Sequence, residues 1–164
     1  MRSTAEFDTR LFRDVLGHFS TGVAVVTASS PISPVGMTVQ SVVALSLDPP
    51  LVLFCPAKSS TSWPAIQSAG HFAVNILAED QVDLASRFAK SGGDKYVDVD
   101  WESGVTTAPI LGGTLAHVEC TFEAVHEGGD HDIAIGRVVD LKVRRSARPL
   151  VFYRGGFGSL APPE

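Results

Sequence analysis

The chain has 164 residues, of which 45% are apolar and 19% charged, and its formal net charge is -5. This length and balance predict one globular domain, 1–164, with its core within about 7–158. The acidic balance and the lack of a basic stripe argue against nucleic-acid binding, and no apolar run approaches the roughly 18 residues that a membrane span needs.

The two cysteines and the N-terminus indicate a compartment. Cys55 and Cys120 form no C-x-x-C pair, so neither a zinc site nor a redox pair is expected. Both lie in apolar runs, which predicts buried free thiols of the kind found in a reducing cytosol. No apolar signal core follows Met1. We therefore expect a soluble cytoplasmic protein, frayed at both ends.

The first half predicts a helix followed by strands. Leu11, Val15 and Phe19 recur at helical spacing, which predicts an amphipathic helix over 7–19 with Asp8 or Thr9 as its cap. The next predicted elements are strands, separated by turns rich in proline, over 23–27, 36–45 and 51–55. The second of these carries polar residues inside it.

The second half alternates strongly between apolar and polar residues. A short helix with Ser62 as its cap is expected over 62–68, a strand over 71–77 and a helix over 80–89. Alternation then predicts strands over 115–125 and 133–143, and a last strand over 149–153. In the first, His117 and Glu119 belong to the face expected to be wholly or partly wet; in the second, Arg137 interrupts the apolar positions. This spacing predicts a mainly β fold with short helices, as a barrel and not a parallel sheet.

The sequence lacks the motifs of several common nucleotide-binding and catalytic sites. The sequence has no Rossmann glycine fingerprint, no Walker A loop and no nucleophile elbow. His126 and His131 flank a Gly-Gly-Asp turn, but no matching third ligand accompanies them, so no metal site is predicted.

Three segments carry polar or flexible residues that a plain barrel does not need. Segment 36–41, with Ser46, could line a pocket around a flat heterocycle, or could be an edge strand with a wet face. Segment 55–62 combines a lysine, consecutive hydroxyls and a helix start, which suits a phosphate but also a simple serine-rich cap. Segment 128–132, with 153–156, could admit a nicotinamide ring, although a lone loop histidine is usually a surface residue.

Together these stretches match a family. The chain resembles the short-chain flavin reductases, which are FMN-binding split-barrel proteins (a Greek-key type) that act as reductase components of two-component flavin-dependent monooxygenases. The similarity spans roughly 7–158 and is nearest to reductases that serve aromatic or steroid-type hydroxylases. The matching stretches are Phe12–Gly17 with Thr21–Val23 and Val25–Thr27, Gly36–Thr38 with Gln40–Ser41, Leu45–Val52, Lys58–Ser60, Phe72–Leu77, Gly129–His131 and Pro149–Gly155.

The resemblance implies an activity and its partners. The expected protein is a homodimeric flavoprotein oxidoreductase that transfers a hydride from NADH to FAD or FMN and supplies reduced flavin to a partner monooxygenase. FAD is favoured by the similarity to hydroxylase reductases, and NADH over NADPH by the lack of a basic pocket for a 2′-phosphate. Two alternatives remain: a flavoenzyme like pyridoxamine-phosphate oxidase, and a non-catalytic flavin-binding module.

The resemblance also implies site residues. The flavin ring and ribityl chain would lie along Gly36, Met37, Thr38, Val39, Gln40, Ser41 and Ser46. The ribityl and phosphate groups would be held by Cys55, Pro56, Ala57, Lys58, Ser59 and Ser60. Two residues of the third expected helix, Arg87 and Phe88, would close over the nucleotide side of the flavin. His131 and Tyr153 would line the nicotinamide site, with His131 orienting the nicotinamide amide and not transferring a proton.

Overall fold

The computed structural model describes residues 8–161. Phe7 of the expected first helix and most of the expected frayed ends lie outside this range. The described residues form three helices and twelve strands: α1 (Thr9–Gly17), β1 (Thr21–Gly22), β2 (Ala24–Ser29), β3 (Pro34–Val39), β4 (Val43–Leu47), β5 (Pro50–Phe54), α2 (Trp63–Ala69), β6 (His71–Ile76), α3 (Val82–Ala89), β7 (Trp101–Ser103), β8 (Pro109–Leu111), β9 (Ala116–Gly128), β10 (His131–Val143), β11 (Leu150–Tyr153) and β12 (Gly156–Ser159).

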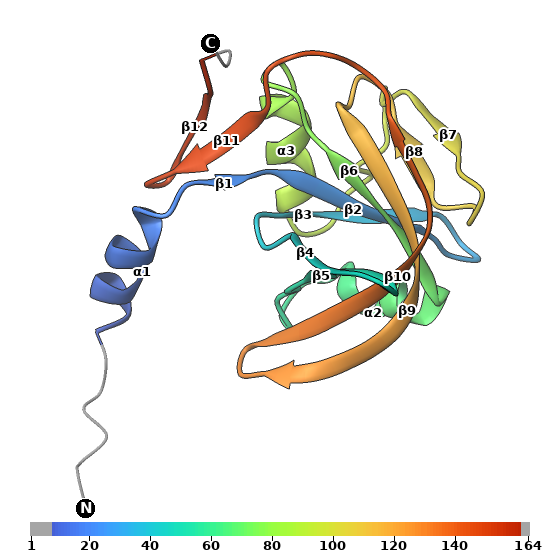
Figure 1. The fold of residues 1–164 in the computed structure, drawn as a ribbon, viewed down its shortest axis with the longest axis horizontal. Coiled ribbons are helices and arrows are strands. Elements are labelled where there is room, and N and C mark those ends of the chain that lie inside the picture. The colour runs from blue at the N-terminus through green and yellow to red at the C-terminus, as the bar shows by residue number, and fades with distance from the viewer. Residues whose placement is uncertain (1–7, 162–164) are drawn as a thin grey trace, which may run out of the picture.

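The main sheet has seven antiparallel strands and curls into a barrel that is left open at one seam. Its strand order is β3-β2-β6-β9-β10-β5-β4 (Figure 1). The two outermost strands, β3 and β4, are consecutive in the chain and are joined by residues 40–42 alone. Such a link spans at most about 14 Å, so the sheet must bend until its edges approach each other. Among the described residues no ladder joins β3 to β4, which gives the split barrel that the family resemblance implies.

The barrel core is built from the inward faces of the central strands. Val26, Phe54 and Phe72 are fully buried there, and the rings of Phe54 and Phe72 meet edge to face at 5.0 Å. Trp63, from α2, adds a third ring at 5.8 Å from Phe54. Cys120 lies in the same cluster, and burial raises the pKa of its thiol to about 12. It is a buried free thiol as predicted, whereas Cys55 is only half-buried.

The expected strand over 36–45 is wrong in its extent. The structure has two strands there, because the chain leaves the sheet at Gln40 and re-enters at Val43. The break holds the polar pair Gln40 and Ser41, but apolar residues continue directly on both sides of it, at Val39 and Val43, so no turn signal marks it in the sequence. The correction matters for function, because it places residues 40–42 at the open seam of the barrel.

The polar face of β9 is also drier than the alternation suggests. His117 and Glu119 are 5% and 1% exposed. The turn between β7 and β8 covers Glu119. This hairpin was not predicted, because its strands have only three residues each. Farther along β9 the same face is exposed. There Arg137 of β10 forms a bidentate ion pair with Glu123, in which two guanidinium nitrogens donate to the carboxylate oxygens at 2.8 and 2.9 Å.

A second, small sheet carries the N-terminal helix at the edge of the molecule. Its order is β1-β11-β12, and α1, which precedes β1 in the chain, lies away from the barrel (Figure 1). Asp8 caps α1 by accepting from the backbone N–H of Arg10 at 2.8 Å, as predicted. No residue of α1 is buried. None of the helices in the described part of the chain is long and apolar enough to cross a bilayer.

Candidate functional site

Two of the three segments singled out in the sequence meet at one hollow. This hollow, called here the serine pocket, has a volume of about 230 Å³ and is lined by Met37 and Thr38 of β3, by residues 57 and 59–61, by Phe88 and residues 89–91, and by Lys95. It therefore joins the predicted ring wall to the predicted phosphate segment. Hydroxyl and ammonium groups line it and no carboxylate does, so its chemistry suits an anion.

The third segment lies directly beside the phosphate segment. The N–H of Lys58 donates to the carbonyl of Asp130 at 3.0 Å, and the N–H of Asp132 donates to the carbonyl of Pro56 at 3.0 Å. Ala57 and His131 form a bridge between these two pairs. The turn between β9 and β10 is thereby held against residues 56–58, which positions His131 next to the serine pocket.

The structure places Lys58 outside that pocket. Its ammonium pairs with Glu127 and lies 3.9 Å from Asp132, both on the β9–β10 hairpin. The hydrogen bond to Glu127 raises the pKa of Lys58. Two neighbouring carboxylates therefore largely offset the positive charge of Lys58, which was predicted to contact an anion. The two serines predicted with it, Ser59 and Ser60, do line the pocket.

The other predicted residues of segment 36–41 and Ser46 lie either in the barrel core or near the open seam of the barrel. Val39 is in the barrel core at 6% exposure. The hydroxyl of Ser41 accepts from the N–H of Cys55 at 2.8 Å, which ties the seam to the end of β5. Gln40 accepts from the hydroxyl of Thr21 at 3.4 Å, and Ser46 lies half-buried on β4. None of these four lines the serine pocket; their contacts to a flavin stay predictions.

The two predicted residues of α3 differ in position. Phe88 is 1% exposed and forms a wall of the serine pocket, while the hydroxyl of Thr38 reaches the same helix at the carbonyl of Ala85, 2.6 Å away. Arg87 is exposed and donates to the carbonyl of Val97, so it braces the loop after α3. It does not line the serine pocket.

The two predicted nicotinamide residues lie on strands of different sheets. His131 is half-exposed, and its Nδ1 lies 2.7 Å from Asp130 Oδ1, a contact that lowers the pKa of Asp130. Tyr153 lies on β11, where its ring meets His18 edge to face at 6.5 Å. No hydrogen bond or ring pair joins Tyr153 to His131 among residues 8–161, and the function of each stays a prediction.

Lys95 lines the serine pocket but is not marked by any pattern in the sequence. This residue follows two glycines and an aspartate in the loop after α3, a setting with no periodic pattern to single it out. Its ammonium donates to the carbonyls of Gly36 and Phe88 at 3.2 and 3.3 Å and to the hydroxyl of Ser62 at 3.3 Å. Ser62 therefore precedes α2 as predicted but makes no capping hydrogen bond; its hydroxyl faces Lys95 instead.

The described residues also line two larger hollows, of which the first adjoins the serine pocket. The first, called here the loop pocket, has a volume of about 540 Å³ and shares Thr61 and Lys95 with the serine pocket; Tyr96 and Trp101 form an aromatic wall, and Asp94 contributes a carboxylate. The second, called here the helix groove, has a volume of about 690 Å³ and lies between α1 and the small sheet, with Gln40 and Arg154 in its lining.

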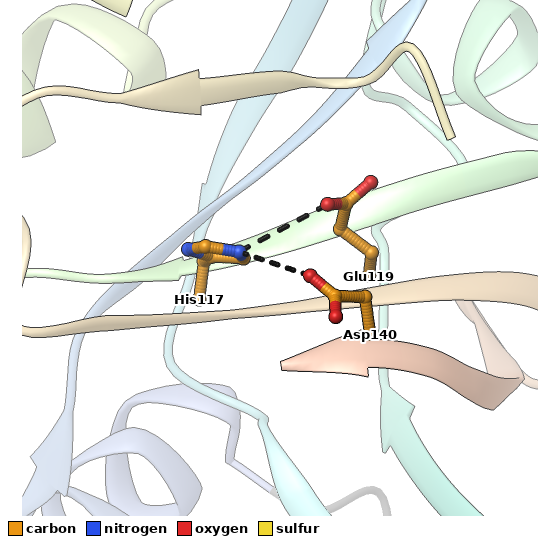
Figure 2. A group of neighbouring side chains, drawn as sticks. All are labelled: His117, Glu119 and Asp140. Carbon is orange, nitrogen blue, oxygen red and sulfur yellow. Dashed lines mark ion pairs between the residues drawn. The ribbon is translucent and has the colours of Figure 1, made fainter. Parts of the chain in front are cut away.

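A separate group of titratable side chains lies under the β7–β8 hairpin. Figure 2 shows His117 and Glu119 of β9 beside Asp140 of β10, with His117 Nε2 at 3.9 and 3.7 Å from their carboxylates. These donor atoms lie within 4.8 Å of one another, as metal ligands can. Glu119, however, already accepts from the N–H groups of Val105 and Thr106 and from the Thr106 hydroxyl, at 3.1, 2.8 and 2.6 Å. We therefore interpret the group as structural, because Glu119 fixes the turn between β7 and β8.

Gly36→Ala is expected to weaken flavin binding about tenfold and to destabilise the fold by about 1 to 3 kcal/mol. An added Cβ would lie 2.7 Å from the ring of Phe88 and 3.1 Å from the carbonyl of Val26. Because Phe88 is buried and lines the serine pocket, a shift of its ring would change the shape of that pocket. Flavin titration and thermal unfolding measure both effects. Gly22→Ala, with nothing within 4 Å of the new Cβ, is the matched control, and unchanged binding in Gly36→Ala would contradict this geometry.

Comparison with known proteins identifies the family. The model of the flavin reductase like domain matches residues 16–161. The reductase subunit HsaB of a flavin-dependent monooxygenase from Rhodococcus jostii is 50% identical over 157 residues, covering 96% of this chain and 80% of that protein. The FMN reductase (NADH) SmoA of Agrobacterium fabrum is 48% identical over 151 residues, covering 92% and 86%.

Solved structures agree in fold. Nitrilotriacetate monooxygenase component B from Mycobacterium thermoresistibile superposes with a TM-score of 0.92 at 48% identity, covering 94% of this chain and 88% of that one. An NADH:FAD oxidoreductase of Streptomyces globisporus, solved in complex with NAD and FAD fragments, has a TM-score of 0.89 at 37% identity and covers 94% of each chain.

Proposed function

The chain belongs to the family of flavin reductase-like domains, and on that premise we propose that it transfers a hydride from NADH to a flavin and supplies the reduced flavin to a partner monooxygenase. The observation that carries the site is the meeting of three predicted segments at and beside the anion-suited serine pocket. Flavin, when bound, supplies the hydride-accepting chemistry, and the protein supplies binding and orientation.

Each part of the site has its own task in this proposal. The hydroxyls of Ser59 and Ser60 hold the flavin phosphate, and Met37 and Thr38 form the wall along the ribityl chain. His131, held by Asp130 through Nδ1, presents Nε2 to the nicotinamide amide. Because the turn at 128–131 is hydrogen-bonded to residues 56–58, the dinucleotide and the flavin are held at one place, and proximity accounts for much of the rate.

We propose FAD as the preferred flavin. The loop pocket adjoins the serine pocket and offers room and a half-exposed aromatic ring, Trp101, for an adenosine group. Arg87 braces the loop that carries Val97 in the lining of this pocket. Trp101→Ala should then weaken FAD binding about tenfold by removing a stacking surface, and leave FMN binding unchanged. Equal dissociation constants for FAD in Trp101→Ala and in the parent protein would contradict this assignment.

We also propose a homodimer. Five apolar side chains on or next to α1 are each more than half exposed in the single chain: Leu11, Phe12, Val15, Leu16 and Phe19. A contiguous apolar surface of this kind marks an interface. A second copy would cover this helix and the helix groove. Sedimentation velocity at micromolar concentration should therefore give the mass of a dimer, and a monomer at that concentration would contradict the proposal.

A steady-state assay tests the enzymatic proposal. The protein is mixed with NADH and either FAD or FMN, and the near-ultraviolet absorbance of NADH is followed. Decay that depends on both protein and flavin is expected. A pyridoxamine-phosphate oxidase-like protein would keep bound FMN that does not respond to NADH, and a non-catalytic module would bind flavin without consuming NADH.

A further inference from the structure

We infer that Lys95 is the cation that binds the phosphate of the flavin, at the boundary between the serine pocket and the loop pocket. The inference rests on the proposed function and adds a binding residue that neither the sequence pattern nor the family resemblance singled out. Its basis is the placement of one ammonium group among three converging segments of the chain.

The first argument is where Lys95 lies. It lines both pockets, and with it in the serine pocket are the hydroxyl-bearing residues 59–61 and a second cationic side chain, Lys90. A phosphate needs several donors that converge on one point, which hydroxyls and ammonium groups supply. A ligand whose phosphate sits at Lys95 would have one hollow on each side, as a flavin with a nucleotide extension requires.

The second argument is that the positive charge of Lys95 has no negative partner. Its three hydrogen bonds go to two backbone carbonyls and one hydroxyl, and no ion pair to a carboxylate is found for it among residues 8–161. Burial lowers the pKa of the Lys95 ammonium, because the charge is partly removed from water. A half-buried cation that neutral oxygens alone satisfy is suited to an anionic ligand that enters later.

The third argument is the contrast with Lys58. Lys58 belongs to the segment that the sequence favours for the phosphate, but its ammonium pairs with Glu127 and lies near Asp132. A phosphate at Lys58 would have to compete with those carboxylates. At Lys95 the direct contacts are neutral, and the nearby Asp94 carboxylate of the loop pocket accepts from the N–H of Tyr96 instead. The three hydrogen bonds of Lys95 also fix its ammonium in place, which lowers the entropic cost of binding.

The experiment compares flavins that differ only in phosphate. Dissociation constants of riboflavin, FMN and FAD are measured by quenching of flavin fluorescence for the parent protein, Lys95→Met, Lys95→Arg and Lys58→Met. Lys95→Met should weaken FMN and FAD binding about 10- to 100-fold, since a hydrogen bond to a charged group is lost, and should leave riboflavin binding unchanged. Lys95→Arg should keep most of the preference for FMN over riboflavin, and Lys58→Met should keep all of it.

Three outcomes would overturn the inference. Equal weakening of all three flavins in Lys95→Met would make Lys95 a structural tie between β3, α3 and α2. Unchanged binding of all three would remove it from the site, and a phosphate-dependent loss in Lys58→Met alone would move the anion contact there. If Lys95→Met does not fold, a competition experiment replaces it. Inorganic phosphate should weaken the binding of FMN but not of riboflavin, both in the parent protein and in Lys95→Arg, which keeps the positive charge. FMN binding that phosphate does not weaken in Lys95→Arg would overturn the inference. Flavin-dependent NADH oxidation by the parent protein, measured in parallel, tests the proposed function separately.

Discussion

His131→Ala should lower kcat/KM for NADH by roughly 10- to 100-fold, because the nicotinamide loses the group that orients it and small misplacements are costly at a hydride-transfer site. The affinity for flavin should not change, since the imidazole does not line the serine pocket. The backbone bridge between Ala57 and residue 131 survives the substitution, so the hairpin keeps its position. Steady-state NADH oxidation and flavin titration of the same preparation measure the two effects.

The same hairpin offers a matched control for this substitution. His126 is also exposed and lies on β9 opposite Ile133, away from the bridge to Ala57. His126→Ala should therefore leave kcat/KM for NADH unchanged. Asp130→Asn keeps a hydrogen-bond partner for Nδ1 but removes the negative charge, and we expect it to fall between the parent and His131→Ala. Normal NADH turnover in His131→Ala would remove this residue from the site.

Gly136→Ala should destabilise the fold by about 3 kcal/mol, at the upper end for overpacking in a core. Gly136 lies on β10 where the strand crosses the barrel core, and an added Cβ would lie 2.4 Å from Cζ of Phe72 and 2.8 Å from Cβ of Cys120. Phe72 and Cys120 are both fully buried, so neither can move into solvent. The melting temperature should fall by roughly 6 to 12 °C for a domain of this size.

The control for this glycine is another strand glycine with open space. Gly158 of β12 has nothing within 4 Å of the position of a Cβ, and Gly158→Ala should change stability little or raise it slightly. Thermal unfolding of both variants, followed by circular dichroism, makes the comparison. A melting temperature of Gly136→Ala equal to that of the parent would show that the core around Phe72 can relax more than this packing allows.

Much of the fold follows from periodicity in the sequence. Long, regularly alternating strands such as β9 and β10 and helices with one apolar face such as α1 and α3 were predicted with errors of a few residues at their ends. The comparisons confirm the predicted family, the split barrel and the enzyme class. The short hairpin of β7 and β8 was missed, because three residues are too few to show a period. It is the turn of this hairpin that covers Glu119.

The candidate site was predictable where it is contiguous and not where it depends on distant loops. Segments 36–38 and 57–60 each combine suitable residues within a few positions, and the structure brings them together at the serine pocket. Lys95 was not predictable, because its position next to Gly36 results from how the loop after α3 folds back across β3. The charge of Lys58 looked available in the sequence, since its partner Glu127 lies 69 positions away on another strand.

The most direct test of the central claim is an anaerobic titration of the protein and FAD with NADH. The visible absorbance of oxidised flavin should bleach in proportion to the NADH added, at a rate that rises with protein concentration, and air should restore it. This result would show hydride transfer to flavin without any partner protein. Flavin that stays oxidised in the presence of protein and excess NADH, with FMN as well as with FAD, would contradict the account.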